Sequence, residues 1–389
     1  MIVLQIVFWC IVLLVFHTYI GFPLILQILS RKKQNISFEN KEFQPVTIIM
    51  PLHNEESVIA EKLDSILQTD YPQDKLYVLI GSDNSTDKTN EIVQQYAEKY
   101  PFIILCVFDK RQGKINIINQ LVEKASTDII IFSDANVMFD KNTVKELVSP
   151  FVVSEIGLVD SNMQNIGLKS DGISIPEKTY ISREVKIKQA ESILWGTMMG
   201  PFGGCFAMRK SLYKPVPQNF LVDDFYICMQ VLQQGKKAIN NINALAFEDV
   251  SNNLADEFRR KIRIATGNFQ NLHVFKHFLL SSQKGLAFCF FSHKVLRWVT
   301  PILLVVYYVI NIILAFYSGF YALLFALFNL LFVLILLDFI LKRHHHHFLF
   351  LRCITHFFSM NLALLIGMCR AVKGVKSSIW QPTARHQAK

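Results

Sequence analysis

The sequence has no G-x-x-x-x-G-K-[ST] run, the loop that wraps nucleotide phosphates in P-loop proteins, and this absence excludes a P-loop nucleotidase. Its seven cysteines have no paired spacing, as expected of reduced thiols. Residues 2–29 contain no Asp, Glu, Lys or Arg and exceed the ~20 residues of a bilayer span. They also lack the leading positive charge, shorter apolar run and small-residue cleavage site of a signal peptide. We therefore expect a retained transmembrane anchor over residues 1–30.

The C-terminal third contains further long apolar stretches. Residues 295–317 and 319–341 are separated only by the short turn YSGFY. A third stretch, 348–369, is less apolar because polar residues interrupt it: Arg352, His356 and Asn361. The sequence predicts two or three transmembrane helices within residues 295–372, preceded by an interfacial segment at 276–294.

The basic residues give two conflicting indications of topology. Arg31, Lys32 and Lys33 follow the first span, which by the positive-inside rule puts the middle domain in the cytoplasm. Three further crossings would leave the tail, residues 373–389, outside, although its own Lys and Arg content predicts it inside. Either the third stretch re-enters or lies in the interface, or one segment is wrong. We predict an integral protein of the cytoplasmic membrane.

The formal net charge of +9 requires no nucleic-acid partner. Basic residues at membrane edges face anionic lipid, which accounts for the excess. The run His344–His347 resembles a metal-binding tract, but Lys342 and Arg343 precede it and it lies between two apolar stretches. We interpret it as a polar loop.

Between about residues 42 and 275, short apolar runs alternate with amphipathic stretches. Six runs are predicted strands: 46–50, 76–81, 102–107, 128–133, 157–162 and 204–208. Four stretches are predicted helices: 55–68, 87–99, 113–124 and 140–149. This alternation predicts an α/β domain with a mostly parallel sheet and helices on both faces. Ligands of such sheets bind at the carboxyl ends of the strands.

Polar turns follow the first two predicted strands. After the first comes PLHNEES, where Pro51 is expected to end the strand and Asn54 and Glu55 to open a helix. After the second comes GSDNSTDKT, which places Asp83 on the turn. Asn84 suits a left-handed conformation there, and the next two residues are candidate helix caps: Ser85 and Thr86. Two polar turns at one sheet edge favour a ligand over simple loop chemistry.

The stretch DIIIFSDANVMFD, residues 128–140, is a fully apolar strand that ends in Ser-Asp-Ala-Asn. Asp134 and Asn136, spaced i and i+2, would share one face if the chain is extended. Their oxygens suit Mg²⁺ or Mn²⁺, which would bridge phosphate groups. The alternative is a capping Asp before a helix. Lys114, at the start of a predicted helix, is a cation suited to an anion at the same edge.

Charged side chains also mark two later helices. Asp223 and Asp224 precede an amphipathic helix, whose N-terminus is expected to lower a carboxylate's pKa and keep a base ionised. Arg260 and Arg263, spaced i and i+3, lie on one face of a helix close to the membrane segments. They could hold a phosphate or a headgroup through forked hydrogen bonds.

Together these stretches resemble the family-2 glycosyltransferases, in particular the membrane-embedded branch that includes cellulose, chitin-oligosaccharide and hyaluronan synthases. The resemblance runs from about residue 45 to 300. PLHNEE is similar to the P-x-x-N-E nucleotide-binding turn of the family. GSDNSTDKT is similar to its D-D-G-S-T-D loop, with Ser82 and Asn84 replacing the first Asp and the Gly, so Asp83 takes the nucleoside role. SDAN stands at the D-x-D position, with Asp134 and Asn136 as the implied metal ligands.

The later motifs carry the acceptor side of the resemblance. GPFGGCFAMRKSL, with Gly203 and Gly204, looks like the acceptor-side G-x-x-x-x-R-R segment, and VDD stands at the T-E-D position. The resemblance therefore implies that Asp224 is the catalytic base. RKIRI occupies the Q-x-x-R-W position and keeps Arg263, but Ile264 replaces the Trp that supports a growing chain in polymerases.

The resemblance implies a Rossmann-like GT-A fold, a nucleotide-diphosphate sugar donor (uridine by family habit), Mg²⁺ or Mn²⁺, and inversion at the anomeric carbon. We predict an inverting hexosyltransferase that acts on a lipid-linked or saccharide acceptor at the membrane, for cell-envelope or extracellular polysaccharide synthesis. The alternative is a processive synthase that also translocates its polymer. A transport or scaffold protein with a regulatory nucleotide domain would not explain the ordered metal and base positions.

Overall fold

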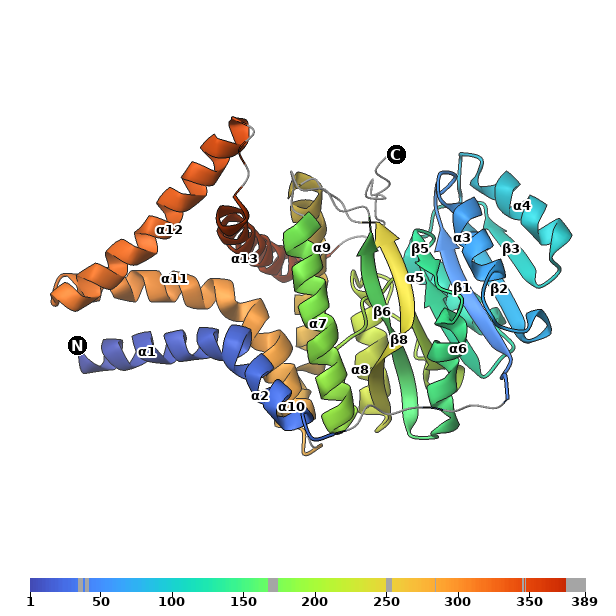
Figure 1. Cartoon of the computed structure of the whole chain (residues 1–389), viewed down its shortest axis with the longest axis horizontal. Coiled ribbons are helices and arrows are strands. Elements are labelled where there is room, and N and C mark those ends of the chain that lie inside the picture. Colours follow the sequence, from blue (N-terminus) through green and yellow to red (C-terminus); the bar gives the residue numbers. More distant parts are fainter. Residues whose placement is uncertain are drawn as a thin grey trace.

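The computed structural model describes residues 1–33, 38, 42–166, 174–249, 254–283, 285–344, 346 and 348–375. In these residues a single eight-stranded sheet has the strand order β3-β2-β1-β4-β7-β6-β8-β5 (Figure 1). Its strands are β1 (Val46–Leu52), β2 (Leu76–Asp83), β3 (Ile103–Phe108), β4 (Ile129–Ser133), β5 (Val137–Phe139), β6 (Ile156–Ile166), β7 (Cys205–Arg209) and β8 (Lys237–Asp249).

The predicted parallel arrangement is confirmed over half of the sheet. Strands β3, β2, β1 and β4 are parallel neighbours, as are β6 and β8. Strand β7 is antiparallel to both β4 and β6, and β5 is antiparallel to β8. The carboxyl ends of β1, β2 and β4 therefore meet at one edge, where the polar turns were expected.

Two strands, β5 and β8, were not predicted. β5 has three residues, and β8 carries the run NNIN, whose asparagines disfavour strands. β8 forms because its buried amides find partners across the fold. The Asn240 amide donates to Asp160 Oδ2 and to the carbonyl of Ser161, and the Asn241 amide donates to Glu146. These contacts depend on residues about 80 positions away, so local propensity could not indicate them.

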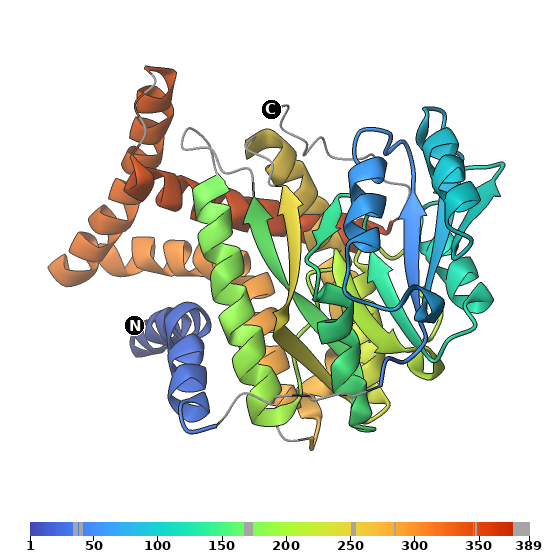
Figure 2. The same ribbon diagram turned by 45° about the vertical axis from the view of Figure 1, so that its right-hand side comes forward.

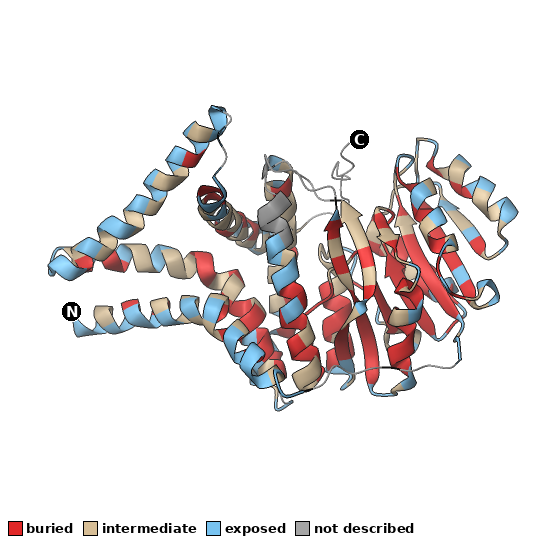
Figure 3. Ribbon diagram, in the orientation of Figure 1, coloured by how far each residue is buried: buried red, intermediate tan, exposed pale blue. Residues whose placement is uncertain are grey.

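Helices cover both faces of the sheet: α3 (Ile59–Leu67), α4 (Thr89–Lys99), α5 (Lys114–Lys124), α6 (Thr143–Val148), α7 (Ser174–Trp195), α8 (Asp223–Gln233) and α9 (Leu254–Phe275). The period of two along β4 divides the core. Ile130 and Phe132 pack with α5 and α8, whereas Ile129 and Ile131 pack with α3 and α6. Figure 3 shows the resulting buried residues along the strands.

Among the residues that the structure describes, four helical segments are long and apolar enough to cross a membrane. The first, Ile2–Ser30, comprises α1 (Ile2–Phe16), a π-helical turn η1 (His17–Gly21) and α2 (Phe22–Ser30). The second, Leu286–Ala315, comprises α10 (Leu286–Cys289), a π-helical turn η6 (Phe290–Val295) and α11 (Leu296–Ala315). The others are α12 (Gly319–Arg343) and α13 (Leu349–Lys373). Many of their apolar residues are exposed, and Figure 3 colours exposed residues pale blue on the ribbon.

Two details differ from the sequence prediction. The second apolar helix begins at Leu286 rather than at residue 295, so helix replaces much of the predicted interfacial segment. The polar residues Ser292 and His293 interrupt the apolar run in sequence, but both are fully buried. Within the predicted polar loop, His345 and His347 lie outside the described residues, as does most of the basic tail, 376–389.

Helix α13 differs from the other apolar helices in its surroundings. It is foreshortened in Figure 1, where α1 and α11 lie across the view, and it is extended in Figure 2. It packs closely on α9, because a Cβ placed on Gly367 would lie 2.4 Å from the Cβ of Ala265. Its interrupting residue Arg352 is buried and forms an ion pair with Asp338 of α12, with Nε 3.1 Å from Oδ1.

Candidate active site

The turns after β1 and β2 are joined by hydrogen bonds. Asn54 has a left-handed backbone with φ 55°, and its Oδ1 accepts a hydrogen bond from the backbone N–H of Thr86 at 2.8 Å. The Glu55 N–H donates to Thr89 Oγ1 at 2.8 Å. Asn54 and Glu55 therefore do not open α3, which begins at Ile59. Their polar groups bond instead to residues that follow β2. This pairing joins two separate parts of the chain, so the local sequence pattern does not reveal it.

Two further local expectations need correction. Strand β1 continues through Pro51 to Leu52, and both residues stay in register with β2 after the pairing with β4 has ended at Ile49. Neither Ser85 nor Thr86 caps α4; Asp87 Oδ1 accepts the Thr89 N–H at 3.0 Å instead. The predicted left-handed conformation of Asn84 is confirmed, with φ 55°.

Asp83 organises the loop that precedes α5. Its side chain is buried, and its two oxygens accept the backbone N–H groups of Gln112 at 2.6 Å and Gly113 at 2.8 Å. Gly113 has φ 86°, which favours glycine at this position. Asp83 thereby sets where α5 begins and where Lys114 points. Its direct contact with a nucleoside stays a prediction.

Lys114 and Asp134 meet at the sheet edge. Lys114 Nζ lies 2.7 Å from Asp134 Oδ1, and both side chains are partly exposed. Burial lowers the pKa of Lys114, but the nearby carboxylates of Asp134, Asp223 and Asp224 outweigh burial and raise it. These acids and this lysine therefore converge from three separate stretches of the chain.

Asn136 does not share an extended face with Asp134. The Val137 N–H donates to the Asp134 carbonyl, so the chain turns here instead of continuing as a strand. The Asn136 amide donates to Glu248 Oε1 of β8 at 3.3 Å. The prediction that Asp134 and Asn136 share one face of an extended chain is therefore wrong. Glu248 places a further carboxylate oxygen here, which the sequence did not indicate.

A buried lysine supports this turn from behind. Lys62 of α3 has no exposed surface, donates to the Val137 carbonyl at 2.5 Å and lies 3.3 Å from the centroid of the Phe139 ring. Burial lowers the pKa of Lys62 to about 7, while Cys205 and Asp134 act in the opposite direction. The sequence did not indicate Lys62 as a functional residue, because it lies among the buried apolar residues of α3.

Asp224 occupies the first turn of α8, as predicted, but its ionisation differs from the prediction. Burial, followed by the neighbouring carboxylate of Asp223, raises the pKa of Asp224 to about 7. The Phe225 N–H, at 2.7 Å from Asp224 Oδ1, and Lys114 act in the opposite direction without compensating. The prediction that the helix N-terminus lowers the pKa of Asp224 is therefore wrong, because the effect of burial is larger.

Gly203 lies directly against the Asp224 carboxylate. It has φ 84°, and a Cβ placed on it would lie 2.4 Å from Asp224 Oδ2. The neighbouring Gly204 contributes its carbonyl, which accepts the backbone N–H of Asp134 at 3.0 Å. The predicted acceptor-side glycines thus contact both key acids.

We expect Gly203→Ala to lower turnover by about 10- to 100-fold, because the new methyl displaces the Asp224 carboxylate and small displacements of reacting groups are costly. The positive φ adds strain of about 1–3 kcal/mol. Gly235→Ala is the matched control, since Gly235 has φ 74° but nothing within 4 Å of an added Cβ. Steady-state kinetics and thermal unfolding of both variants test this; equal losses of turnover would show that strain alone is responsible.

The two arginines of α9 have different surroundings. Arg260 forms two 2.8 Å hydrogen bonds with the Glu257 carboxylate. Burial lowers the pKa of Arg263, and Arg260 lowers it further, whereas Asp223, Asp134 and Asp224 raise it. Arg263 therefore lies within electrostatic reach of Asp134, Asp223 and Asp224, which together form the acidic cluster.

A second buried ion pair lies beneath the Gly203 loop. Lys188 Nζ of α7 is 2.7 Å from Asp160 Oδ2 of β6, and both side chains are almost fully buried. Asp160 Oδ1 accepts the Phe202 N–H at 3.3 Å, and Lys188 Nζ lies 3.2 Å from the centroid of the Phe202 ring. The sequence did not indicate this pair. Taken alone, Lys188 looks like an ordinary polar residue of a helix, and Asp160 looks like an ordinary polar residue of a strand.

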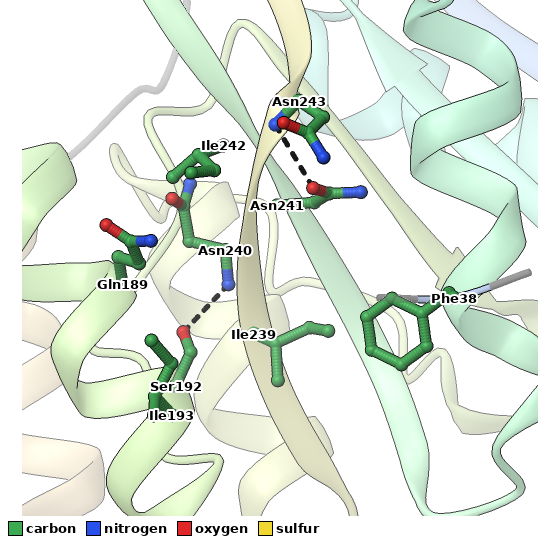
Figure 4. Close-up of a pocket in the computed structure, with 9 residues that line it drawn as sticks. All are labelled: Phe38, Gln189, Ser192, Ile193, Ile239, Asn240, Asn241, Ile242 and Asn243. Atoms are coloured by element: carbon green, nitrogen blue, oxygen red, sulfur yellow. Dashed lines mark hydrogen bonds between the residues drawn. The ribbon is translucent and has the colours of Figure 1, made fainter. Parts of the chain in front are cut away.

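A cavity of about 80 Å³ lies between α7 and β8 (Figure 4). Figure 4 shows the Asn240 N–H donating to Ser192 Oγ, at 2.8 Å. Its lining is apolar or uncharged: Phe38, Gln189, Ser192, Ile193, Ile239, Asn240, Asn241, Ile242 and Asn243. Because no lining side chain is ionisable, this cavity supplies neither a base nor a carboxylate ligand, and the cluster of Asp134, Asp223 and Asp224 remains the candidate site.

The donor set at the acidic cluster is compatible with a hard divalent ion. Asp134 and the side-chain Oδ1 of Asn136 would hold it, because the hydrogen bond to Glu248 uses only the Nδ2 of Asn136. Within the described part of the chain, no group of three or more His, Cys, Asp or Glu is arranged to bind a metal. Mg²⁺-type ions are often held by one or two carboxylates together with substrate phosphates, so this small set fits an ion that binds with a phosphorylated ligand.

Comparison with known proteins finds similarity to glycosyltransferases over part of this region. Residues 47–216 match the family model described as Glycosyl transferase family 2. The probable glycosyltransferase YdaM of Bacillus subtilis is 25% identical over 242 residues, 59% of this chain and 56% of the relative. The poly-β-1,6-N-acetyl-D-glucosamine synthase of Staphylococcus aureus is 23% identical over 246 residues, 62% of this chain and 58% of the relative. The matches thus span less than two thirds of these relatives.

A solved structure gives the fold over nearly the whole chain. The mannosyltransferase PcManGT from Pyrobaculum calidifontis, in complex with GDP-Man and Mn²⁺, superimposes with a TM-score of 0.71 at 21% identity. The superposition covers 95% of this chain and 99% of the other. The predicted GT-A fold with flanking apolar helices is confirmed.

Proposed function

Because residues 47–216 match the glycosyl transferase family 2 model, we propose that this chain is an inverting glycosyltransferase that moves a sugar from a nucleotide-diphosphate sugar to a membrane-associated acceptor. The observation that carries the proposal is the position of Asp224. Its carboxyl, with a pKa of about 7, faces Lys114 and Asp223 and lies against Gly203, at the edge that also holds Asp134.

Asp224 acts as the general base. It takes the proton from the acceptor hydroxyl while that oxygen attacks the anomeric carbon and the bond to the diphosphate breaks. The electron pair leaves with the nucleoside diphosphate, and one displacement inverts the anomeric centre. A base with a pKa near neutrality is suited to this task. No covalent intermediate is required.

The leaving group carries charge that must be stabilised. Lys114 and Arg263 are the cations near the acidic cluster, and they stabilise the departing diphosphate. A divalent ion on Asp134 and Asn136, Mg²⁺ or Mn²⁺, would supply further neutralisation of that charge. The interlocked turns with Pro51, Asn54, Glu55 and Asp83 form the nucleotide side, and uridine is the proposed base. Gly203, Gly204, Asp223 and Arg260 form the acceptor and diphosphate side.

We assign residues 1–30 as an anchor, 42–275 as the cytoplasmic transferase domain and 295–372 as the membrane-associated C-terminal region. The packing of α13 on α9 supports an interfacial position for α13, so that α1, α11 and α12 cross the membrane. Three crossings put the basic tail in the cytoplasm, which removes the conflict in the positive-inside rule. The membrane is the cytoplasmic membrane.

A processive synthase is the second candidate, and one relative, the Staphylococcus aureus enzyme, is named as a polymer synthase. Against it, Ile264 stands where the polymerases of the family carry a Trp platform. Three crossings are also few for a polymer channel. Single transfer, in envelope or extracellular polysaccharide synthesis, is therefore the favoured form.

The test uses sealed membrane vesicles containing the full chain, a panel of labelled UDP- and GDP-sugars, and Mn²⁺ or Mg²⁺. We expect release of nucleoside diphosphate and a single added sugar only in vesicles whose cytoplasmic face is outward. A ladder of products would establish the processive alternative. Release from right-side-out vesicles alone would reverse the proposed orientation, and no transfer from any donor would refute the function.

A further inference from the structure

The two π-helical turns of the apolar helices meet each other. Thr18 Oγ1 in η1 donates to the Ser292 carbonyl in η6 at 2.7 Å, and His17 Nε2 lies 2.9 Å from Ser292 Oγ. π-turns are rare within helices and occur frequently at functional sites. Here η6 itself contains a buried histidine, His293, which contacts α7 of the sheet domain.

His293 lies between two carboxylates of α7. It has no exposed surface, its Nδ1 is 2.7 Å from Glu191 Oε1, and its Nε2 is 2.9 Å from Glu184 Oε2. The protonated imidazole can donate to both. Glu184 also pairs with Arg297 of α11. Burial raises the pKa of Glu184, but Arg297 and His293 outweigh burial and hold it well below its usual value, so Glu184 is a carboxylate.

Glu191 makes one contact that Glu184 does not make. Its second oxygen, Oε2, accepts the backbone N–H of Met199 at 3.0 Å. Met199 lies in the segment 196–204, which connects α7 to β7 and carries Gly203 against Asp224. One fully buried carboxylate therefore joins a membrane-entering helix to the loop that positions the base.

The same loop and the start of α8 pack on the membrane side. A Cβ on Gly200 would lie 2.5 Å from the Phe225 ring. Phe225, which follows Asp224, packs edge-on against Trp298 of α11 with centroids 5.5 Å apart. The far end of the loop is held by Asp160, through the Phe202 N–H. A shift of α11 relative to α7 would therefore be transmitted to the 196–204 loop on one side of Asp224 and to Phe225 on the other.

We propose that Glu191 is a positioning residue. Through Glu191, the position of α10 and α11 in the membrane determines where the Asp224 carboxylate lies. Glu191 does not touch substrate; it acts through Met199, the 196–204 loop and Gly203. The inference rests on the proposed function insofar as Asp224 is the base. The buried contacts among Glu191, Met199 and His293 stand independently of that role.

The test compares Glu191→Met with Glu184→Met in the full chain in lipid nanodiscs. Both remove a carboxylate from the same histidine, but only the first removes the bond to Met199. For Glu191→Met we expect kcat to fall about tenfold and the apparent pKa of the pH–rate profile to shift, with donor KM unchanged, because a displaced base slows chemistry without affecting donor binding. Glu184→Met should retain kcat within about twofold. Glu191→Gln keeps an acceptor for Met199 and should recover most of the rate.

Hydrogen exchange of peptides covering residues 196–204 provides a readout that needs no activity. We expect faster exchange in Glu191→Met but not in Glu184→Met. Equal effects of the two variants, or no effect of either, would overturn the proposal. If Glu191→Met does not fold, Glu191→Asp and Glu184→Asp replace the pair, because aspartate keeps the charge but is too short to reach both partners. Absence of sugar transfer by the wild-type chain would refute the proposed function and leave the exchange result to decide the positioning role.

Discussion

Asp224→Asn is expected to lower kcat for sugar transfer by about 10³-fold, while affinity for the nucleoside diphosphate stays within about threefold. The amide preserves the size of the side chain and its contact with Gly203 but cannot accept the proton of the acceptor hydroxyl. Removal of a general base typically lowers rates by about 10²- to 10⁴-fold. Transfer is measured with a labelled donor, and binding is measured by calorimetry on the same preparation.

The adjacent acid provides the matched control. Asp223→Asn removes the carboxylate that helps to raise the Asp224 pKa, so it should lower the apparent pKa of the pH–rate profile. Because it leaves the base in place, its loss of kcat should be far smaller than that of Asp224→Asn, and its effect on the acceptor side should appear in the acceptor KM. In the wild-type chain, transfer should fall as pH falls through about 7, because Asp224 must be ionised to act. Full activity of Asp224→Asn, or a rate independent of pH between 5 and 8, would remove Asp224 from the proposed role.

The same pKa makes a prediction about stability. The folded-state pKa of Asp224, about 7, is above the ordinary value of 3.8, so the folded chain binds the proton more tightly than the unfolded chain. The resulting stabilisation is fully present below the unfolded pKa and is lost as pH rises through about 7. Asp224→Asn should therefore gain thermal stability relative to the wild type at pH 8 and gain less at pH 5.

Asp134→Ala is expected to lower kcat/KM by about 10²- to 10³-fold and to remove the stimulation by Mn²⁺ or Mg²⁺. Asp134 is the carboxylate that pairs with Lys114 and would hold the ion, so its loss leaves the charge of the departing diphosphate less well neutralised. In the wild-type chain, excess chelator should reproduce most of this loss. Initial rates at a series of Mn²⁺ concentrations measure both effects.

Asp128→Ala is the matched control for this variant, because Asp128 precedes the same strand at its opposite end and is exposed. Its backbone carbonyl accepts the Lys210 N–H, and the substitution leaves that bond intact. We expect no change in kcat/KM. Undiminished turnover in excess chelator, or with alanine at position 134, would remove the ion from the scheme and leave Lys114 and Arg263 as the cations at the diphosphate.

Local chemistry and periodicity determined several features from sequence alone. The uncharged stretch at 2–29 and the apolar runs after residue 295 predicted the helices that could span a membrane, because bilayer thickness sets their length. The apolar strand at 128–133 and its polar end predicted β4 and the position of Asp134. These properties depend on neighbouring residues, so a linear pattern is sufficient to find them.

Other features depended on contacts between distant parts of the chain, and only the tertiary structure decided them. The raised pKa of Asp224 comes from burial and from Asp223 in a site assembled by several loops, whereas a helix N-terminus considered alone predicts the opposite direction. The contacts of Asn54 with Thr86, of Asn136 with Glu248 and of His293 with Glu191 join residues that are far apart in sequence. Burial and electrostatic interaction depend on three-dimensional proximity, which period and propensity do not encode.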